Sequence, residues 1–163
     1  AGAIAHMNAR GYVHADVKPN NILVADDGTV KIIDLGQSCA IGTVKQRIQG
    51  TPDFIAPEQV RRQPLDGRTD VFNFGASLYW TVTGKPIPTE IPRKSSSMLK
   101  VDNLVTAPEV INPEVPMSLN KLVMDCIEPV PARRPDSMSA VQARLGLIHH
   151  NLSRSNGNGN GAS

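Results

Sequence analysis

Residues 14–21 of the chain read HADVKPNN, and residues 34–36 read DLG. Among their residues are two acids, Asp16 and Asp34, together with the lysine Lys18 and the amide Asn21. Phosphoryl transfer needs a carboxylate that orients the attacking hydroxyl, a cation for the moving phosphate and oxygen ligands for Mg²⁺. The two stretches supply each of these groups, so they are the first candidates for a functional site.

A hairpin separates the two stretches. Asn21–Val24 and Thr29–Ile33 are short apolar runs, and the turn residues Asp26-Asp27-Gly28 lie between them. Acidic residues followed by glycine are typical of tight turns between antiparallel strands. The sequence predicts a small β-ribbon here, bracketed by the candidate loops.

The rest of the fold is predicted to be mainly helical. Ala1 to Arg10 has the composition of a helix that stops at Gly11, and no capping residue opens it. We therefore expect the chain to begin inside an element and to be part of a longer protein. A second helix, capped by Thr69 or Asp70 and ending at Gly84, is apolar nearly all round, which predicts a buried axis.

Two more helices are expected to pack on this axis. One starts at Ser118 and runs through Ile127, and the other follows Asp136 with apolar residues at helical spacing on one face, Met138, Val141, Leu145 and Ile148. Residues 37–49 are expected to form an ordered loop. A proline-rich connector precedes Ser118, with one short helix expected near Ser97–Val101. Residues 149–163 are polar and rich in glycine, which predicts a disordered tail or linker.

The composition of the chain argues against several classes of binding partner. The 163 residues are 40% hydrophobic and carry a formal net charge of +2, too small to indicate nucleic acid or a membrane surface. Cys39 and Cys126 are too few for a disulfide framework, which favours a reducing cytoplasmic setting. No apolar run approaches the roughly 18 residues that would span a bilayer. We expect no membrane contact by this segment, although a parent protein could be anchored through other segments.

Five motifs resemble those of protein kinases. HADVKPNN is similar to the family's catalytic loop, H-R-D-L-K-P-x-N, and DLG to its D-F-G magnesium motif. Ala56-Pro57-Glu58 matches A-P-E, residues 70–75 (DVFNFG) resemble D-x-W-x-x-G, and residues 133–135 (RRP) resemble the arginine-proline near the end of the domain. Order and spacing agree over Ala1 to Ile148. The resemblance implies that residues 1–148 are a partial kinase domain, the C-terminal lobe of the protein-kinase-like fold.

The resemblance implies roles for the candidate residues. Asp16 would accept or orient the proton of the substrate hydroxyl, and Lys18 would neutralise charge on the γ-phosphate of ATP. Asn21 and Asp34 would hold Mg²⁺, and Leu23 would lie under the adenine. The implied substrate is a serine or threonine hydroxyl of a protein, because a lysine two places after the aspartate is the serine/threonine form of this loop.

Four further residues receive implied roles outside the chemical step. Thr51, in Gly50-Thr51-Pro52, would hydrogen-bond near Asp16 and Lys18, in agreement with the serine/threonine form. Glu58 would pair with Arg134, and Asp70 would brace the catalytic loop by accepting its amides. The last two roles are structural.

Several family features differ or are missing. Ala15 stands where many kinases have an arginine that binds a phosphorylated residue of the activation loop. Activation by phosphorylation of this loop therefore lacks its usual arginine partner here. Leu35 for Phe and Phe72 for Trp are mild apolar changes. No G-x-G-x-x-G strand pair, V-A-I-K-like lysine or partner glutamate helix occurs in the 163 residues, so the N-terminal lobe is absent from them. We expect this segment alone to be inactive.

Alternatives remain open. The lobe could be a catalytically silent binding or scaffold module, against which the retained Asp16, Lys18, Asn21 and Asp34 count. Cys39 could be a redox switch or simply a small loop residue, and His149-His150 more simply form solvated surface than a metal site. His14 is expected to be structural. The particular protein substrate, the regulator and the oligomeric state cannot be predicted.

Overall fold

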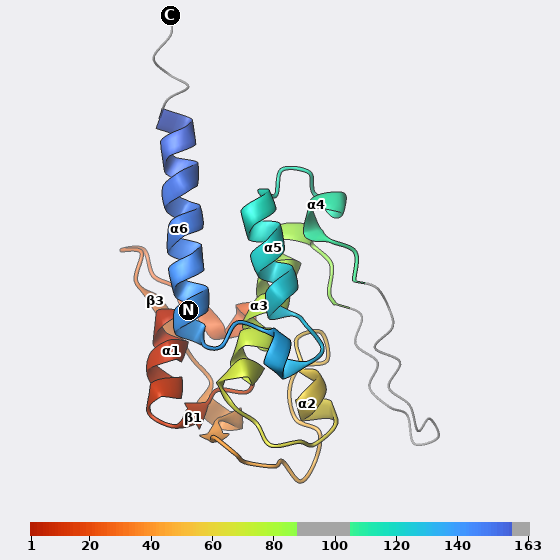
Figure 1. The fold of residues 1–163 in the computed structure, drawn as a ribbon. Coiled ribbons are helices and arrows are strands. Elements are labelled where there is room, and N and C mark those ends of the chain that lie inside the picture. Colours follow the sequence, from red (N-terminus) through yellow and green to blue (C-terminus); the bar gives the residue numbers. More distant parts are fainter. Residues whose placement is uncertain (88–104, 158–163) are drawn as a thin grey trace, which may run out of the picture.

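The computed structural model describes residues 1–87 and 105–157, with side chains as far as Arg154. The helix predicted near Ser97–Val101 and residues 158–163 of the predicted tail lie outside the described residues. The α-helices are α1 (Gly2–Ala9), α2 (Pro57–Val60), α3 (Gly67–Thr83), α4 (Pro108–Ile111), α5 (Met117–Cys126) and α6 (Met138–Gly157). The strands are β1 (Tyr12–Val13), β2 (Ile22–Val24), β3 (Val30–Ile32) and β4 (Cys39–Ala40), and three 3₁₀ turns are η1 (Pro19–Asn21), η2 (Leu35–Gln37) and η3 (Pro131–Arg133). The described chain is thus mainly helical, as predicted (Figure 1).

Two small antiparallel ribbons carry the loops of interest. The hairpin of β2 and β3 is confirmed, with Ile22 opposite Ile32, and Gly28 in its turn has a φ of 79° that favours glycine. The second ribbon, in which β1 pairs with β4, was not predicted. Two residues per strand are too few to show an alternating pattern, so the sequence gives no signal for it.

Helix α3 is the buried axis of the described chain. It begins earlier than predicted, because Asp66 is the N-cap and accepts a hydrogen bond from the Arg68 amide at 2.8 Å. The predicted caps, Thr69 and Asp70, instead lie in the first turn and are fully buried. The helix ends at Gly84 in the left-handed conformation, as expected.

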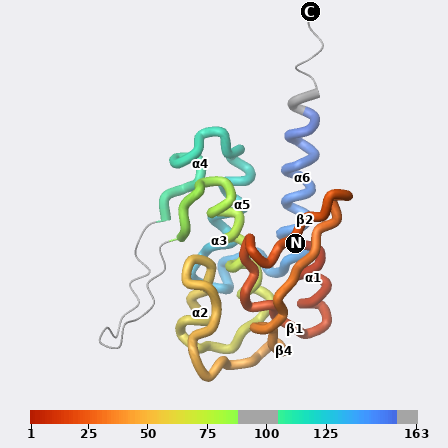
Figure 2. The backbone as a smooth tube through the Cα atoms, turned by 180° about the vertical axis from the view of Figure 1, so that it is seen from behind, coloured from red at the N-terminus to blue at the C-terminus, as the bar shows by residue number. Residues whose placement is uncertain are grey.

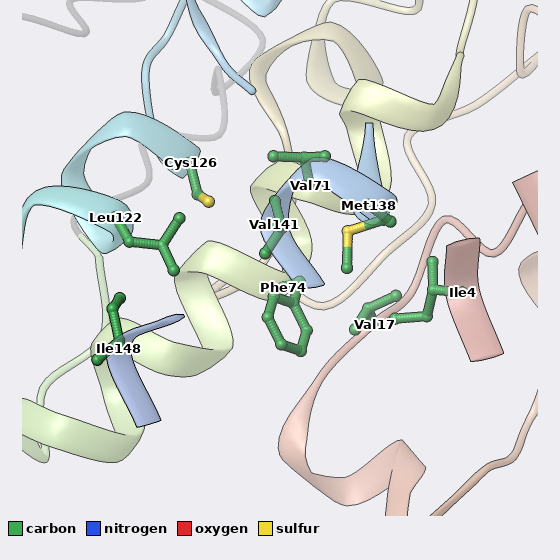
Figure 3. Packing of buried hydrophobic residues seen from close by; sticks show 9 residues of the cluster. All are labelled: Ile4, Val17, Val71, Phe74, Leu122, Cys126, Met138, Val141 and Ile148. Carbon is green, nitrogen blue, oxygen red and sulfur yellow. The ribbon is translucent and has the colours of Figure 1, made fainter. Parts of the chain in front are cut away.

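Helices α1, α5 and α6 pack around α3. Figure 3 shows the main apolar cluster, which takes residues from all four helices and one from the loop at residue 17: Ile4, Val17, Val71, Phe74, Leu122, Cys126, Met138, Val141 and Ile148. The predicted apolar face of α6 is therefore confirmed, with Leu145 partly buried at its edge. Burial raises the pKa of the Cys126 thiol to about 12, so this cysteine is a core residue rather than a nucleophile.

A second cluster fixes the segment that leads into α2. Phe54 and Ala56 pack against Phe72, Ala76 and Tyr79 of α3. Because Val17 and Phe54 belong to different clusters that both include residues of α3, this helix sets the relative position of the loop between β1 and β2 and the segment between β4 and α2.

Helix α6 is longer than predicted. It continues to Gly157, so residues 149–157 are helical rather than part of a disordered tail. Residues 149–154 contain neither glycine nor proline, and the Ser153 hydroxyl donates to the His149 carbonyl at 2.9 Å. The end of α6 rises away from the other elements in both views (Figures 1 and 2). None of the helices within residues 1–87 and 105–157 has the length and apolar character needed to cross a membrane.

Candidate active site

Asp70 braces the loop that carries Asp16. Its Oδ2 accepts hydrogen bonds from the His14 amide at 2.9 Å and the Asn8 side-chain amide at 2.7 Å, and its Oδ1 accepts from the Ala15 amide at 2.9 Å. Ala15 has a φ of 63°, a left-handed conformation that costs a residue with a Cβ about 1–2 kcal/mol. The carboxylate therefore holds the loop in a conformation that it would not adopt freely.

The Asp70 carboxyl is fully buried, and this changes its acidity. Desolvation raises its pKa above the usual value, while the amide hydrogen bonds from His14, Ala15 and Asn8 act in the opposite direction. The net effect is a raised pKa.

His14 links the loop to the end of the ribbon. Its Nε2 lies 3.2 Å from the Ile33 carbonyl, and its Nδ1 lies 3.3 Å from the Asp16 amide nitrogen. The imidazole is completely buried. The contacts agree with a structural part for this residue, because both ring nitrogens already face backbone groups.

Asp16, Lys18 and Thr51 form one hydrogen-bonded cluster. The Lys18 ammonium donates to Asp16 Oδ2 at 2.8 Å and to the Thr51 hydroxyl oxygen at 2.7 Å, and that hydroxyl donates to Asp16 Oδ1 at 3.0 Å. The side chain of Lys18 is 20% exposed, whereas that of Asp16 is 8% exposed and therefore buried. Residues far apart in the sequence thus meet at a single carboxylate.

Asn21 lies beside this cluster. Its side-chain amide donates to the Asp16 carbonyl at 2.9 Å and sits 3.3 Å from Asp16 Oδ2. The backbone carbonyl of Asn21 accepts a hydrogen bond from the backbone amide of Ile33 at 3.0 Å. This bond brings Ile33, the residue before Asp34, next to Asn21. The ribbon therefore places the backbone at Asp34 close to the Asp16 loop.

Asp34 is exposed and has a left-handed φ of 60°. Its Oδ1 accepts from the Gly36 amide at 3.2 Å, which caps η2. No hydrogen bond joins its side chain to Asp16 or Asn21 in the part of the chain that the structure describes. The structure brings the Asp34 backbone to the site and leaves its carboxylate facing solvent.

Asn21 and Asp34 each have a side-chain oxygen of the kind that Mg²⁺ binds. Because the Asn21 amide nitrogen faces Asp16, its side-chain oxygen is left without a hydrogen-bond donor among the described residues. One carboxylate oxygen of Asp34 is likewise free of any described donor. Magnesium takes one or two protein oxygens and completes its shell with water and phosphate. Within residues 1–87 and 105–157 no group of three or more His, Cys, Asp and Glu side chains could hold a metal ion.

Leu23 lies in β2 with 49% of its surface exposed. Several other apolar side chains of the ribbon and the turn after it are exposed as well, among them Val24, Val30 and Leu35. Leu23 pairs with Lys31 and Val24 with Val30, so the exposed apolar side chains of the ribbon lie on both of its faces.

The implied pair of Glu58 and Arg134 is present and buried. The guanidinium donates to the two carboxylate oxygens at 2.7 and 2.9 Å. It also donates to the carbonyls of Glu128 and Arg68 and lies 4.8 Å from the centre of the Phe72 ring. Arg134 therefore ties α2 to the start of α3 and to the segment before η3.

Sequence reasoning missed two buried amide side chains. Gln59 donates to the Ala15 carbonyl at 2.8 Å and the Gln49 carbonyl at 3.2 Å, and it accepts from Asn73 at 2.9 Å. Asn73 also donates to the Phe54 carbonyl at 2.7 Å. The position of Asn73 between the apolar residues Phe72 and Phe74 could have indicated it, because buried polar groups are nearly always hydrogen-bonded. These bonds connect the Asp16 loop to the segment around Thr51.

The comparisons with known proteins agree with this geometry. A family model of the protein kinase domain matches residues 1–145. A probable serine/threonine-protein kinase of Clostridium acetobutylicum is 34% identical over 152 residues, which are 90% of this chain and 23% of that protein. Serine/threonine-protein kinase PknL of Mycobacterium tuberculosis is 34% identical over 155 residues, 93% of this chain and 39% of that protein.

A third relative, the probable serine/threonine-protein kinase PknB of Bifidobacterium longum, is 32% identical over 120 residues, 70% of this chain and 17% of that protein. The chain thus spans well under half the length of the curated relatives that it matches. A family model that covers residues 1–145 of the 163 shows the family, and the chain belongs to the protein kinase family.

Proposed function

We propose that this chain is the C-terminal lobe of a serine/threonine protein kinase, which transfers the γ-phosphate of ATP to serine or threonine hydroxyls of proteins. The observation that carries the proposal is the cluster in which Lys18 and Thr51 both bind the Asp16 carboxylate. This cluster supports the proposal because it joins a carboxylate, a cation and a hydroxyl-bearing side chain by direct hydrogen bonds.

Asp16 is proposed to orient the substrate hydroxyl. As the hydroxyl oxygen forms its bond to the γ-phosphorus, the bond from phosphorus to the bridging oxygen of ADP breaks, and the proton passes to the Asp16 carboxylate. Lys18 is already held 2.8 Å from that carboxylate, so its charge is positioned for the transferred phosphate without further ordering. The hydroxyl of Thr51 fixes the second carboxylate oxygen.

Asn21 and Asp34 are proposed to hold Mg²⁺ through their side-chain oxygens. When bound, the ion neutralises phosphate charge. The hydrogen bond from Asn21 to the Asp16 carbonyl fixes the amide, so its oxygen keeps one direction. Leu23 is proposed to lie under the adenine of ATP, where an exposed apolar side chain gains from burial.

Specificity for serine and threonine rests on two residues. Lys18 occupies the position typical of this class, and Thr51 binds both Lys18 and Asp16. The names of the relatives support the same class, because each of the three is described as a serine/threonine-protein kinase.

Transfer is proposed to require a second lobe above the ribbon. The 163 residues contain no glycine-rich strand pair and no lysine in a V-A-I-K context. A formed pocket buries about 70–90% of a ligand of this size, whereas the ribbon covers the nucleotide from one side. We therefore expect weak nucleotide binding and no measurable transfer by this chain alone.

The test is a radiolabelled ATP assay with a serine/threonine peptide. It compares the 163-residue chain with a chain that carries the complete two-lobed domain. The two-lobed chain should transfer phosphate, and Asp16→Asn should reduce the rate by about 10²–10⁴-fold, the usual range for a general base. The matched control is Asp26→Asn, because Asp26 is exposed in the hairpin turn.

Two results would contradict the proposal. Transfer that survives Asp16→Asn would show that Asp16 does not take the proton. A two-lobed chain without any transfer would favour the silent binding module instead.

A further inference from the structure

Two segments near the candidate active site run side by side in opposite directions. The amide of Gly42 donates to the Leu65 carbonyl at 2.8 Å, and the Leu65 amide donates to the Thr43 carbonyl at 3.1 Å. Further along, Arg62 reaches the Gln46 carbonyl at 3.5 Å and Gln59 reaches the Gln49 carbonyl at 3.2 Å. Two backbone bonds join residues 42 and 43 to residue 65, and two side-chain bonds bring Arg62 to residue 46 and Gln59 of α2 to residue 49. Residues 42–49 therefore lie alongside residues 59–65.

The two segments that lie side by side carry several positively charged residues. Residues 41–65 contain four cations, Lys45, Arg47, Arg61 and Arg62, which we call the basic strip. Arg62 reaches the carbonyl of Gln46, the residue before Arg47, and Arg61 precedes Arg62, so these three arginines lie in one region of the chain surface. Arg47, Arg61 and Arg62 are exposed, and Lys45 is half-buried.

The charges of the basic strip are not compensated within the described residues. Lys45 and Arg62 bind the carbonyls of Gln37 and Gln46, which fixes the side chains and leaves their charges in place. No described Asp or Glu forms an ion pair with any of the four cations. Residues 41–65 hold two acids, and one of them, Glu58, is buried against Arg134, which leaves Asp53. Neighbouring like charges repel, so an unpaired group of this kind costs stability unless it serves a partner.

The basic strip leads directly to the proposed acceptor site. Gln59, between the two halves of the strip, binds the carbonyls of Gln49 and Ala15. Thr51, two residues after Gln49, hydrogen-bonds to Asp16 and Lys18. A peptide whose serine or threonine reaches Asp16 would therefore pass its flanking residues near the strip.

We propose that the basic strip binds acidic side chains that flank the phosphorylated serine or threonine, so that the preferred substrates are acidic peptides. This inference rests on the proposed function, because it takes Asp16 as the point that the hydroxyl reaches. Complementary charge steers a substrate to its site and excludes peptides of the same sign. Binding is then expected to weaken as salt rises, since exposed charges are screened beyond about 8–10 Å at 0.10–0.15 M ionic strength.

The test measures binding of fluorescent peptides to the 163-residue chain by anisotropy. Three peptides share a central serine and differ only in flanks of glutamate, glutamine or lysine. The glutamate peptide should bind most tightly and the lysine peptide least. The double variant Arg47→Gln/Arg61→Gln should weaken glutamate-peptide binding about fivefold, as expected for two exposed charge pairs.

The control removes the same charge elsewhere. Lys121 and Arg154 are exposed on α5 and α6, and the end of α6 lies at the opposite end of the molecule from α2 in Figures 1 and 2. Lys121→Gln/Arg154→Gln should leave the preference unchanged. Equal binding of the glutamate and glutamine peptides, or an equal loss in the control variant, would overturn the inference.

A phosphate-transfer assay with the two-lobed chain separates this inference from the proposed function. Transfer with no preference for the glutamate peptide would contradict the acidic specificity and leave the kinase proposal standing. Absence of transfer, together with binding that depends on Arg47 and Arg61, would contradict the kinase proposal and leave an acidic-peptide surface.

Discussion

Arg134 joins three parts of the chain through one guanidinium, which binds both carboxylate oxygens of Glu58 and the carbonyls of Arg68 and Glu128. The pair is almost fully buried. Arg134→Ala leaves the Glu58 carboxylate buried without its partner, which costs about 3–5 kcal/mol of unfolding free energy. Urea denaturation followed by circular dichroism measures the change.

The neighbouring arginine provides the control for this prediction. Arg133 is exposed, and Arg133→Ala is expected to change stability by less than about 0.5 kcal/mol. If Arg134→Ala unfolded at the same urea concentration as the parent, the buried pair would not be stabilising the fold.

Asp70 gives a pH-dependent prediction at the same scale. Burial raises the pKa of its carboxyl in the folded chain above the ordinary 3.8, so the folded state takes up a proton before the unfolded state does as pH falls. The contribution of Asp70 to stability is therefore greatest below the ordinary pKa and is lost as pH rises through the folded value. Asp70→Asn lacks this titration.

The measurement is the difference in unfolding free energy between the parent and Asp70→Asn at several pH values. Near neutral pH the variant should be less stable, because an amide cannot accept all three donors from Asn8, His14 and Ala15. The difference in unfolding free energy between the parent and the variant should increase as pH falls toward 4. A gap that narrows over this range would show that the hydrogen bonds outweigh desolvation.

At the scale of elements, α3 and α5 approach each other closely at Gly75. A Cβ built at this position would lie 2.5 Å from the Cβ of Cys126. Gly75→Ala must push the two helices apart, and overpacking of this kind costs about 1–3 kcal/mol. Thermal unfolding should show a clear drop in Tm.

Gly146 in α6 is the matched control, because a Cβ there meets nothing within 4 Å. Gly146→Ala should be neutral or stabilise the helix by up to about 1 kcal/mol. Equal Tm values for the two variants would contradict the close helix contact.

The elements also show what the sequence could predict. The hairpin, α3 and the apolar face of α6 follow from turn residues and from regular apolar spacing, and the structure has all three. The pairing of β1 with β4 could not be predicted, because each strand has two residues and its partner lies far away in the sequence. Residues 149–157 were predicted to be disordered because they are polar, but they continue α6 to Gly157. The absence of a helix-breaking residue before Gly157 was the better signal.

The candidate site divides in the same way. Asp16, Lys18, Thr51 and Asn21 are brought together as the motif spacing indicated. The amide network of Gln59 and Asn73 was missed because Gln59 stands in no motif and Asn73 stands at a variable position of D-x-W-x-x-G, and its bonds depend on how the loop at Ala15 meets α3. Such contacts between distant segments leave almost no trace in local sequence.

At the scale of the whole molecule, the central claim is that Asp16, Asn21 and Asp34 belong to one metal and phosphate site. The Ile33 amide donates to the Asn21 backbone carbonyl and the Ile33 carbonyl contacts the His14 imidazole, which brings the loops together, while Asp34 is exposed.

The most direct measurement uses Mn²⁺ in place of Mg²⁺, with ADP in excess, and follows backbone amide resonances of the ¹⁵N-labelled 163-residue chain. Paramagnetic broadening falls steeply with distance, so it should be strongest at Asn21 and residues 33–36 and absent over α5. Asp34→Asn should abolish the broadening, and Asp26→Asn should preserve it. Broadening that is absent, that is centred on the Asp26-Asp27 turn, or that survives Asp34→Asn would contradict the site.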